Sequence, residues 1–246
     1  MRWIFISPHF DDAVLSCGGL IREFNRQGKK VEIWTVNSGI PAEGPVSDLI
    51  TRVHAKWKTG TPQETIELRR VEDQNAARLV GAALQHLGLV DAIYRRSETG
   101  EYFYTDDVFD PIHPGEGDIV QQTAMGIAAG GLSKNDILVC PLALGGHVDH
   151  VIVRKAVESL GQETWYYADI PYHFMHAEEL VAAVEGMRDQ QFSISDDSLA
   201  TWQAGIEAYT SQLSSLFEDA EDMHERIKNY RDVTGGLRIW SSALPN

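Results

Sequence analysis

Short apolar runs alternate with stretches of helical periodicity in the first part of the chain. Residues 3–7 form a continuous apolar run that is typical of a buried strand. Over residues 12–27 apolar side chains recur near helical spacing, and Gly28 follows as a helix stop. Residues 31–36 have the composition of a second strand. This order predicts a β-α-β unit, in which the strands are parallel and the crossover is right-handed.

A second, longer helix begins at the stretch Thr61-Pro62-Gln63-Glu64. The threonine is a preferred N-cap, the proline suits the first helical position, and the glutamate completes a capping box. We expect this helix to run to about Ala83. A short amphipathic piece precedes it at residues 49–57. The pattern predicts the later elements in this order: a short strand at 92–94, a helix at 118–129, a strand at 137–140, a helix at 151–160, a strand at 164–168 and a mostly helical, acidic segment at 176–231.

Together these elements predict the α/β fold class. We expect a Rossmann-like open sheet of mostly parallel strands, with helices on both faces and an acidic helical C-terminal part. Residues 95–117, rich in Tyr, Phe, Asp, Pro and Gly, predict a long ordered loop, and loops of that length are usually functional. The pattern shows no repeat and no linker, so we expect a single domain over residues 1–246.

The composition is that of an ordinary globular protein. The 246 residues are 43% hydrophobic and 23% charged, which is enough to bury a core without crosslinks. Two cysteines, Cys17 and Cys140, lie far apart, and the sequence does not open with a signal-peptide pattern, so we expect a reducing, cytoplasmic location. No apolar run approaches the roughly 20 residues of a membrane span, and we expect no membrane partner.

The net charge of −15 is unevenly distributed. Residues 1–100 carry 13 Lys and Arg against 12 Asp and Glu, whereas residues 101–246 carry 8 against 24. An acidic surface repels phosphate backbones, so we exclude nucleic acid as a partner. The charge otherwise indicates solubility, and it leaves the formation of a homo-oligomer open.

Titratable side chains directly follow two of the predicted buried strands. The two clusters are His9, Asp11 and Asp12, and His147, Asp149 and His150. In open parallel sheets, ligands bind outside the carboxyl ends of the strands, which is where both clusters fall. Hydrolytic zinc sites use three protein ligands of this kind and leave a fourth position for water. The two clusters together predict one shared metal site.

Each cluster taken alone has a simpler interpretation. A His-Asp pair often caps a helix, and Asp12 stands where an N-cap would serve the first helix. However, three buried titratable groups are costly unless they are paired, and a metal ion is one of the few partners for all three. The coincidence of two clusters at one sheet edge favours the shared site.

At these residues the sequence resembles the PIG-L family of metal-dependent N-acetylglucosaminyl deacetylases, also called LmbE-like proteins. Three family signatures occur in the family's order: P-H-x-D-D at residues 8–12, Arg-x-x-Glu at residues 69–72 and H-x-D-H at residues 147–150. The segments 166–172 and 237–240 also agree with the family. The resemblance extends over almost the whole chain.

The resemblance implies a zinc ion held by two histidines and one aspartate. Its ligands would be His9, Asp12 and His150, and Fe²⁺ or another divalent ion is the alternative metal. The family signature often continues with a third acidic residue where this chain has Ala13. Because that position is not matched to a ligand, we expect the metal site to survive the difference.

The resemblance also implies catalytic roles. Asp11 would be the general base, and a protonated His147 would steady the tetrahedral intermediate. Asp149 would orient His147 and favour its charged form. Arg69 would contact the substrate, although an arginine in an amphipathic helix is otherwise a solvated surface residue. Some relatives carry a tyrosine just before the later histidines where this chain has glycines at residues 145–146, so the proton donor to the leaving amine is left open.

The implied activity is hydrolysis of the N-acetyl amide of an amino sugar or its glycoside, with release of acetate. Zinc and an aspartate base would activate the attacking water. A soluble, small-molecule substrate is expected, and four loop aromatics are candidates to stack on a sugar face or to anchor the loop: Tyr102, Phe103, Tyr104 and Phe109. The alternatives are a metal-dependent hydrolase of another amide or an ester, and a non-catalytic sugar-binding relative. The latter predicts loss of ligands or base, and this chain retains them.

Overall fold

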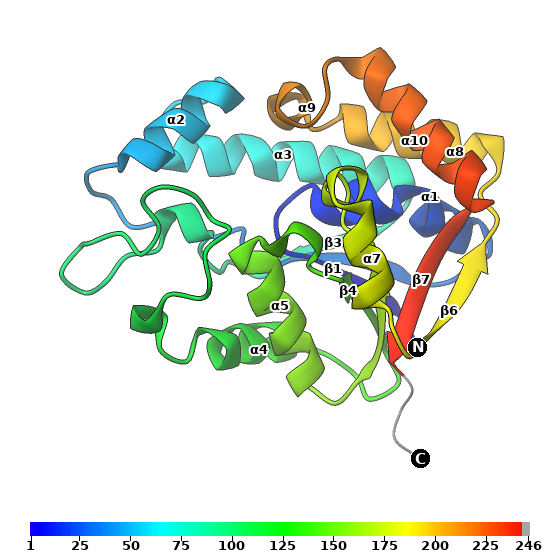
Figure 1. Cartoon of the computed structure of the whole chain (residues 1–246), viewed down its shortest axis with the longest axis horizontal. Coiled ribbons are helices and arrows are strands. Elements are labelled where there is room, and N and C mark those ends of the chain that lie inside the picture. Colours follow the sequence, from blue (N-terminus) through cyan, green and yellow to red (C-terminus); the bar gives the residue numbers. More distant parts are fainter. Residues whose placement is uncertain (243–246) are drawn as a thin grey trace.

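A seven-stranded sheet forms the centre of the molecule in the computed structural model, which describes residues 1–242 (Figure 1). The strand order is β3-β2-β1-β4-β5-β7-β6. Neighbouring strands from β3 to β5 are parallel, whereas β7 pairs antiparallel with both β5 and β6. The predicted Rossmann-like, mostly parallel sheet is therefore confirmed. The strands are β1 (Trp3–Ser7), β2 (Val31–Thr35), β3 (Ala83–His86), β4 (Ile137–Pro141), β5 (Glu163–Tyr167), β6 (Met187–Phe192) and β7 (Leu237–Ser242).

Helices cover both faces of this sheet (Figure 1). One apolar layer joins the sheet to α1, α3, α8 and α10, and a second layer joins it to α4 and α5. Strand β1 supplies both layers, because Phe5 points into the first while Ile4 and Ile6 point into the second, as the pleat requires. The helices are α1 (Asp12–Arg26), α2 (Asp48–Trp57), α3 (Pro62–Val80), α4 (Ile119–Ala129), α5 (Val148–Ser159), α6 (Tyr172–Met175), α7 (Ala177–Ala183), α8 (Asp196–Glu207), α9 (Thr210–Leu216) and α10 (Ala220–Thr234).

The predicted start of α3 is confirmed. The Thr61 hydroxyl accepts the backbone N–H of Glu64, and the Glu64 carboxylate accepts the backbone N–H of Thr61, which completes the capping box. The helix ends at Val80, three residues earlier than predicted. Its last turn closes there because Gly81 adopts a left-handed conformation with φ of 83°.

Two predicted elements differ from the structure. The apolar residues 92–94 form a 3₁₀ turn rather than a strand, because the Asp91 carboxylate accepts the backbone N–H of Ile93 and caps the turn. The third strand is β3 instead. The segment 176–231 is mostly helical, as predicted, but it also includes β6, an edge strand whose side chains are mostly exposed and therefore show no apolar alternation.

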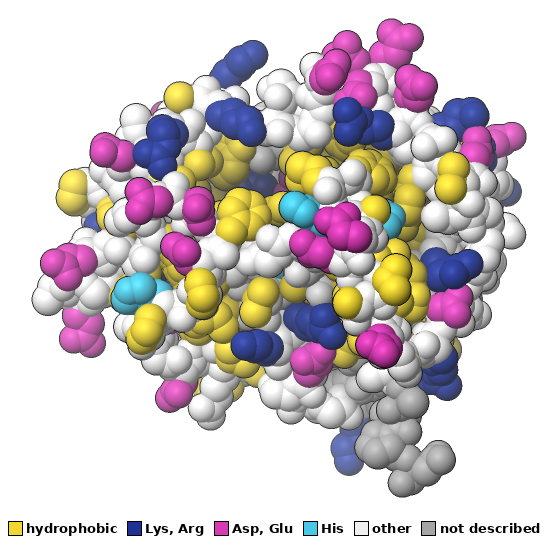
Figure 2. All heavy atoms as spheres, viewed as in Figure 1, with side chains coloured by type: hydrophobic (Ala, Val, Ile, Leu, Met, Phe, Trp, Pro, Cys, Tyr) yellow, Lys and Arg dark blue, Asp and Glu magenta, His cyan; other side chains and the backbone are white. Residues whose placement is uncertain are grey.

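The carboxyl ends of β1, β4 and β5 lie side by side, and the loop of residues 95–117 reaches this edge, where the carbonyl of Val108 accepts the backbone N–H of Val148. That loop is ordered by a bridge between Arg96 and Tyr102 and by the buried side chain of Tyr104, as predicted. In the space-filling view, acidic side chains gather over the end of the molecule formed by α9 and α10 (Figure 2). Within residues 1–242, no helix has the length and apolar character needed to cross a membrane.

Candidate active site

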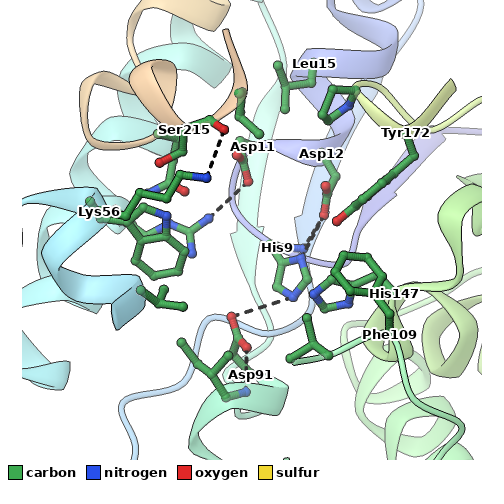
Figure 3. Close-up of a pocket in the computed structure, with 18 residues that line it drawn as sticks. His9, Asp11, Asp12, Leu15, Lys56, Asp91, Phe109, His147, Tyr172 and Ser215 are labelled. Atoms are coloured by element: carbon green, nitrogen blue, oxygen red, sulfur yellow. Dashed lines mark hydrogen bonds and ion pairs between the residues drawn. The ribbon is translucent and has the colours of Figure 1, made fainter. Parts of the chain in front are cut away.

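The two predicted clusters meet at the carboxyl ends of β1 and β4. Figure 3 shows His9, Asp11 and Asp12 of the first cluster near His147 of the second. His9 follows β1, Asp12 opens α1, and His150 lies in the first turn of α5. The Asp12 Oδ2 atom is 3.3 Å from Nδ1 of His9 and 3.3 Å from Nε2 of His150. All three side chains are buried. The structure thus brings the three predicted metal ligands together, with the Asp12 carboxylate between the two histidine rings.

His150 is oriented for ligation by a carboxylate behind it. Its Nδ1 atom lies 2.6 Å from Oδ1 of Asp169, which places the ring proton on Nδ1. The opposite atom, Nε2, is buried and has no hydrogen-bond partner among the described residues. Burial lowers the pKa of His150, but the carboxylates of Asp12 and Asp169 raise it to about 9. Without a cation the ring is therefore protonated at neutral pH, and a divalent cation between Nε2 and the Asp12 carboxylate would take the place of the Nε2 proton.

Asp149 has a different role from the predicted one. Its carboxylate lies 3.0 Å from Nε2 of His9, accepts the backbone N–H of Ala92 at 2.9 Å and forms an ion pair with Arg95. Burial raises the pKa of Asp149, but Arg95 and His9 lower it more, so the carboxylate stays ionised. The side chain therefore orients His9 rather than His147. The cause is its position inside the first turn of α5, from which the carboxylate reaches the loop that carries Arg95.

His147 is held by a backbone group. Its Nδ1 atom accepts the backbone N–H of Asp149 at 3.1 Å, so the proton of the neutral ring lies on Nε2. Burial and the neighbouring His9 and His150 lower the pKa of His147 well below its usual range, although Asp149 raises it. The expected charged imidazole is thus replaced by a neutral one that can still donate from Nε2.

Ring nitrogens of His9, His147 and His150 also lie within 4.8 Å of one another, so distance alone would allow His147 as a ligand. A ligating Nε2 would move the ring proton to Nδ1, which could then no longer accept the Asp149 N–H. The hydrogen bond therefore favours a donor role for His147.

The helix-cap interpretation of Asp12 is wrong, because α1 begins at Asp12 itself. Asp11 is the N-cap of α1 by position but makes no side-chain cap hydrogen bond. Instead, the Ser7 hydroxyl accepts the backbone N–H of Ala13 at 3.0 Å, while the Asp12 carboxylate accepts the backbone N–H of His9 at 2.7 Å. Both carboxylates remain directed into the site.

Arg69 is the partner of Asp11, and it is not a surface residue. Only 3% of Arg69 is exposed, and its Nη2 atom donates to Oδ1 of Asp11 at 3.1 Å. The guanidinium lies over the rings of Trp57 and Phe10, at 4.7 and 5.1 Å from their centroids. Burial raises the pKa of Asp11 above its usual value and Asp12 adds to the shift, although Arg69 and His9 oppose it. Arg69 therefore fixes the position of this carboxylate and favours its charged form.

A cavity of about 270 Å³ opens onto these residues. Its outer wall comes from α2, α9 and the 95–117 loop, which contribute Trp57, Leu216 and Phe109 (Figure 3). Of the four loop aromatics, Phe109 lines this cavity, and Tyr104 is buried against Glu116.

Several residues of the site were not predicted from the sequence. Asp169 follows β5, so the rule that found the two clusters would also have found it. Asp91, Arg95 and Tyr172 have no such signal, because they lie in loops or in a short helix and only the tertiary structure brings them to the site.

The comparison with known proteins decides the family. The model described as PIG-L, GlcNAc-PI de-N-acetylase, matches residues 4–160, which contain both clusters. The chain belongs to the PIG-L family. The predicted family, fold class and N-deacetylase activity are thereby confirmed.

Relatives of this PIG-L protein match it over most of their length. A 2'-N-acetylparomamine deacetylase from Niallia circulans is 32% identical over 253 residues, which cover 97% of this chain and 90% of the relative. The crystal structure of a deacetylase from the biosynthesis pathway of teicoplanin superimposes with a TM-score of 0.82 at 26% identity, covering 98% of this chain and 97% of the other. A zinc-inhibited form of a teicoplanin deacetylase gives 0.80 at 26% identity, with the same coverage. Together with the His/Asp cluster, this neighbour indicates a divalent metal ion.

Proposed function

We propose that this PIG-L protein is a zinc-dependent deacetylase of an N-acetylated amino sugar within a small glycoside, and that it releases acetate. The observation that carries the proposal is the environment of the two ring nitrogens of His150. Its Nδ1 atom is bound by Asp169, and its Nε2 atom is buried without a partner 3.3 Å from Asp12. With Nδ1 of His9, these atoms would supply the two-nitrogen, one-oxygen donor set of a catalytic zinc site.

Around this ion, the other buried residues act on the water and on the amide. When bound, the metal would lower the pKa of water toward about 7 and polarise the acetyl carbonyl. Asp11 would take the proton of the attacking water, and Arg69 would hold the carboxylate in position for that transfer. His147 would donate from Nε2–H to the oxygen of the attacked carbonyl, where negative charge develops.

The cavity favours a single sugar ring with its N-acetyl group as the buried part of the substrate. Its volume is about 270 Å³, and Trp57 and Phe109 flank it as aromatic surfaces for a sugar face. The relative that acts on 2'-N-acetylparomamine supports an aminoglycoside-like substrate, whose cationic remainder would suit this acidic chain with its net charge of −15. Two buried free cysteines, Cys17 and Cys140, fit the proposed cytoplasmic location.

A substrate panel tests the proposal directly. Purified protein would be given 2'-N-acetylparomamine, simple N-acetylglucosaminides, N-acetyl amino acids and acetate esters, each with and without a chelator. We expect acetate release from the N-acetyl sugars, loss of activity with the chelator and recovery with Zn²⁺. Preferred turnover of esters or amino-acid amides would make the protein a different hydrolase, and full activity in demonstrably metal-free protein would contradict the metal site.

The adjacent carboxylates give a sharper test. Asp12→Ala removes one of three proposed ligands, so metal affinity and activity should fall together. Asp11→Asn keeps the shape of the base but cannot take a proton, so this variant should keep its metal, bind substrate and lose at least 99% of turnover, on the order of the general-base contribution. Metal content by atomic spectroscopy and acetate release would be measured on both. The roles are reversed if Asp11→Asn loses the ion while Asp12→Ala retains it.

A further inference from the structure

Tyr172 places a phenol in the active-site cavity from an element outside both clusters. The residue opens α6, after β5, and its ring lines the cavity. The ring is held on three sides. It meets His150 edge-on at 5.5 Å between centroids, it lies 6.0 Å from Phe109, and it packs against Gly145.

Gly145 is needed for this placement of the ring. A Cβ atom at this position would lie 2.8 Å from Cδ1 of Tyr172, closer than real contacts allow, and the backbone φ of 72° also favours glycine. The glycine pair before His147 therefore makes room for Tyr172, which the sequence alone did not indicate.

The hydroxyl of Tyr172 has no hydrogen-bond partner within residues 1–242. Figure 3 shows it directed into the cavity, toward Asp12 and His9. Two fully buried tyrosines do have partners: the hydroxyl of Tyr167 donates to the carbonyl of Ile6, and that of Tyr209 donates to Asp73. The hydroxyl of Tyr172 thus opens onto the cavity, where a molecule bound there can serve as its hydrogen-bond partner.

We propose that Tyr172 is a catalytic residue that donates a hydrogen bond to the carbonyl oxygen of the attacked acetyl group, as a second donor beside His147. This inference rests on the proposed deacetylase function. A rigidly held O–H that points to the position where charge develops stabilises the transition state more than the ground state, because it need not reorganise during the reaction. The role requires no proton transfer, since a phenol keeps its proton at neutral pH and acts as a donor.

The test is Tyr172→Phe, which removes one oxygen and keeps the ring between Gly145, His150 and Phe109. We expect kcat to fall by about a hundredfold, as for the loss of one oxyanion donor, with unchanged metal content and nearly unchanged KM. Affinity for a phosphonamidate analogue of the tetrahedral intermediate should fall by the same factor as kcat/KM, while affinity for the amine product should not change. The matched control is Tyr166→Phe, because the Tyr166 hydroxyl donates to Glu158 and the residue does not line the cavity.

Each outcome of these measurements supports or overturns the proposed role of Tyr172. Equal kcat values for Tyr172→Phe and the parent protein would overturn the role of Tyr172 and leave the deacetylase function intact. Loss of metal, or equal loss of analogue and product affinity, would make Tyr172 a structural support of His150 and would overturn the inference as well. Absence of acetate release by the parent protein over the whole substrate panel would instead overturn the proposed function, and the inference with it.

Discussion

Replacing Arg69 by methionine removes the partner of a buried carboxylate and should destabilise the protein strongly. The side chains of Arg69 and Asp11 are 4% and 8% exposed, and their nearest atoms are 3.1 Å apart. At that separation, two unit charges attract by about 5 kcal/mol if the effective dielectric constant is about 20. Breaking a buried pair costs about 3–5 kcal/mol because the remaining charge stays buried. We therefore expect Arg69→Met to lower the free energy of unfolding by about 3–5 kcal/mol.

A double-mutant cycle measures this interaction. Arg69→Met, Asp11→Asn and the double variant would be unfolded in urea at neutral pH with a chelator present, so that metal binding does not contribute. Methionine is chosen because its flexible chain can fill the space between Phe10 and Trp57. The double variant leaves no unpaired charge behind, so it should be more stable than the sum of the single effects by about 2–3 kcal/mol.

Arg70→Met is the matched control. The guanidinium of Arg70 donates to the carbonyl oxygen of Ser38 from Nε at 3.1 Å and from Nη2 at 2.7 Å. Its replacement should cost about 1 kcal/mol and show no coupling to Asp11→Asn. Effects of Arg69→Met and Asp11→Asn that add within about 0.5 kcal/mol would refute the pairing of these two residues.

Two further predictions concern other carboxylates. Asp169→Ala should weaken metal binding by about 10–100-fold, because the Nδ1 atom of His150 loses its acceptor. Competition with a chromogenic chelator measures the metal affinity, and an unchanged affinity would contradict the role of Asp169 in orienting His150. Hydrogen bonds from Arg2 lower the pKa of Asp136 from 3.8 to about 2. This ion pair therefore stabilises the fold above about pH 4, and its contribution should be lost as the pH falls toward 2. Between pH 4 and pH 2 the urea midpoint of unfolding should fall less steeply for Asp136→Asn than for the parent protein. The same pH dependence in both proteins would contradict the contribution of this ion pair.

The sequence predicts the central part of the fold because its elements have strong periodicity. Strand β1, helix α1 and strand β2 were predicted within one residue at each boundary. Residues 92–94 were wrongly predicted as a strand because three apolar residues are too few to show a period. Their conformation is set by the hydrogen bond from the backbone N–H of Ile93 to the Asp91 carboxylate. Strand β6 has no apolar pattern because it lies at the edge of the sheet with most of its side chains in solvent.

The same limit applies to the site. The position of the proposed ligand residues was predictable because parallel strands end at one edge of a sheet, so two separate clusters had to meet. The partners of those ligands were not predictable, because they depend on tertiary packing. Asp149 reaches His9 and Arg95 rather than its neighbour His147, and Asp169 reaches His150 from the next strand of the sheet.

The pairing of β1 with β4 has a consequence for the order of events during folding. His9 and Asp149 are 140 positions apart along the chain, so the site is a contact of very high sequence separation. An ion bound there would act as a crosslink that closes one long loop, and such closures stabilise most when the enclosed chain is long. Metal uptake during refolding should therefore follow the assembly of the central strands, and a nascent chain that ends before α5 would hold neither the ion nor the power to hydrolyse an amide.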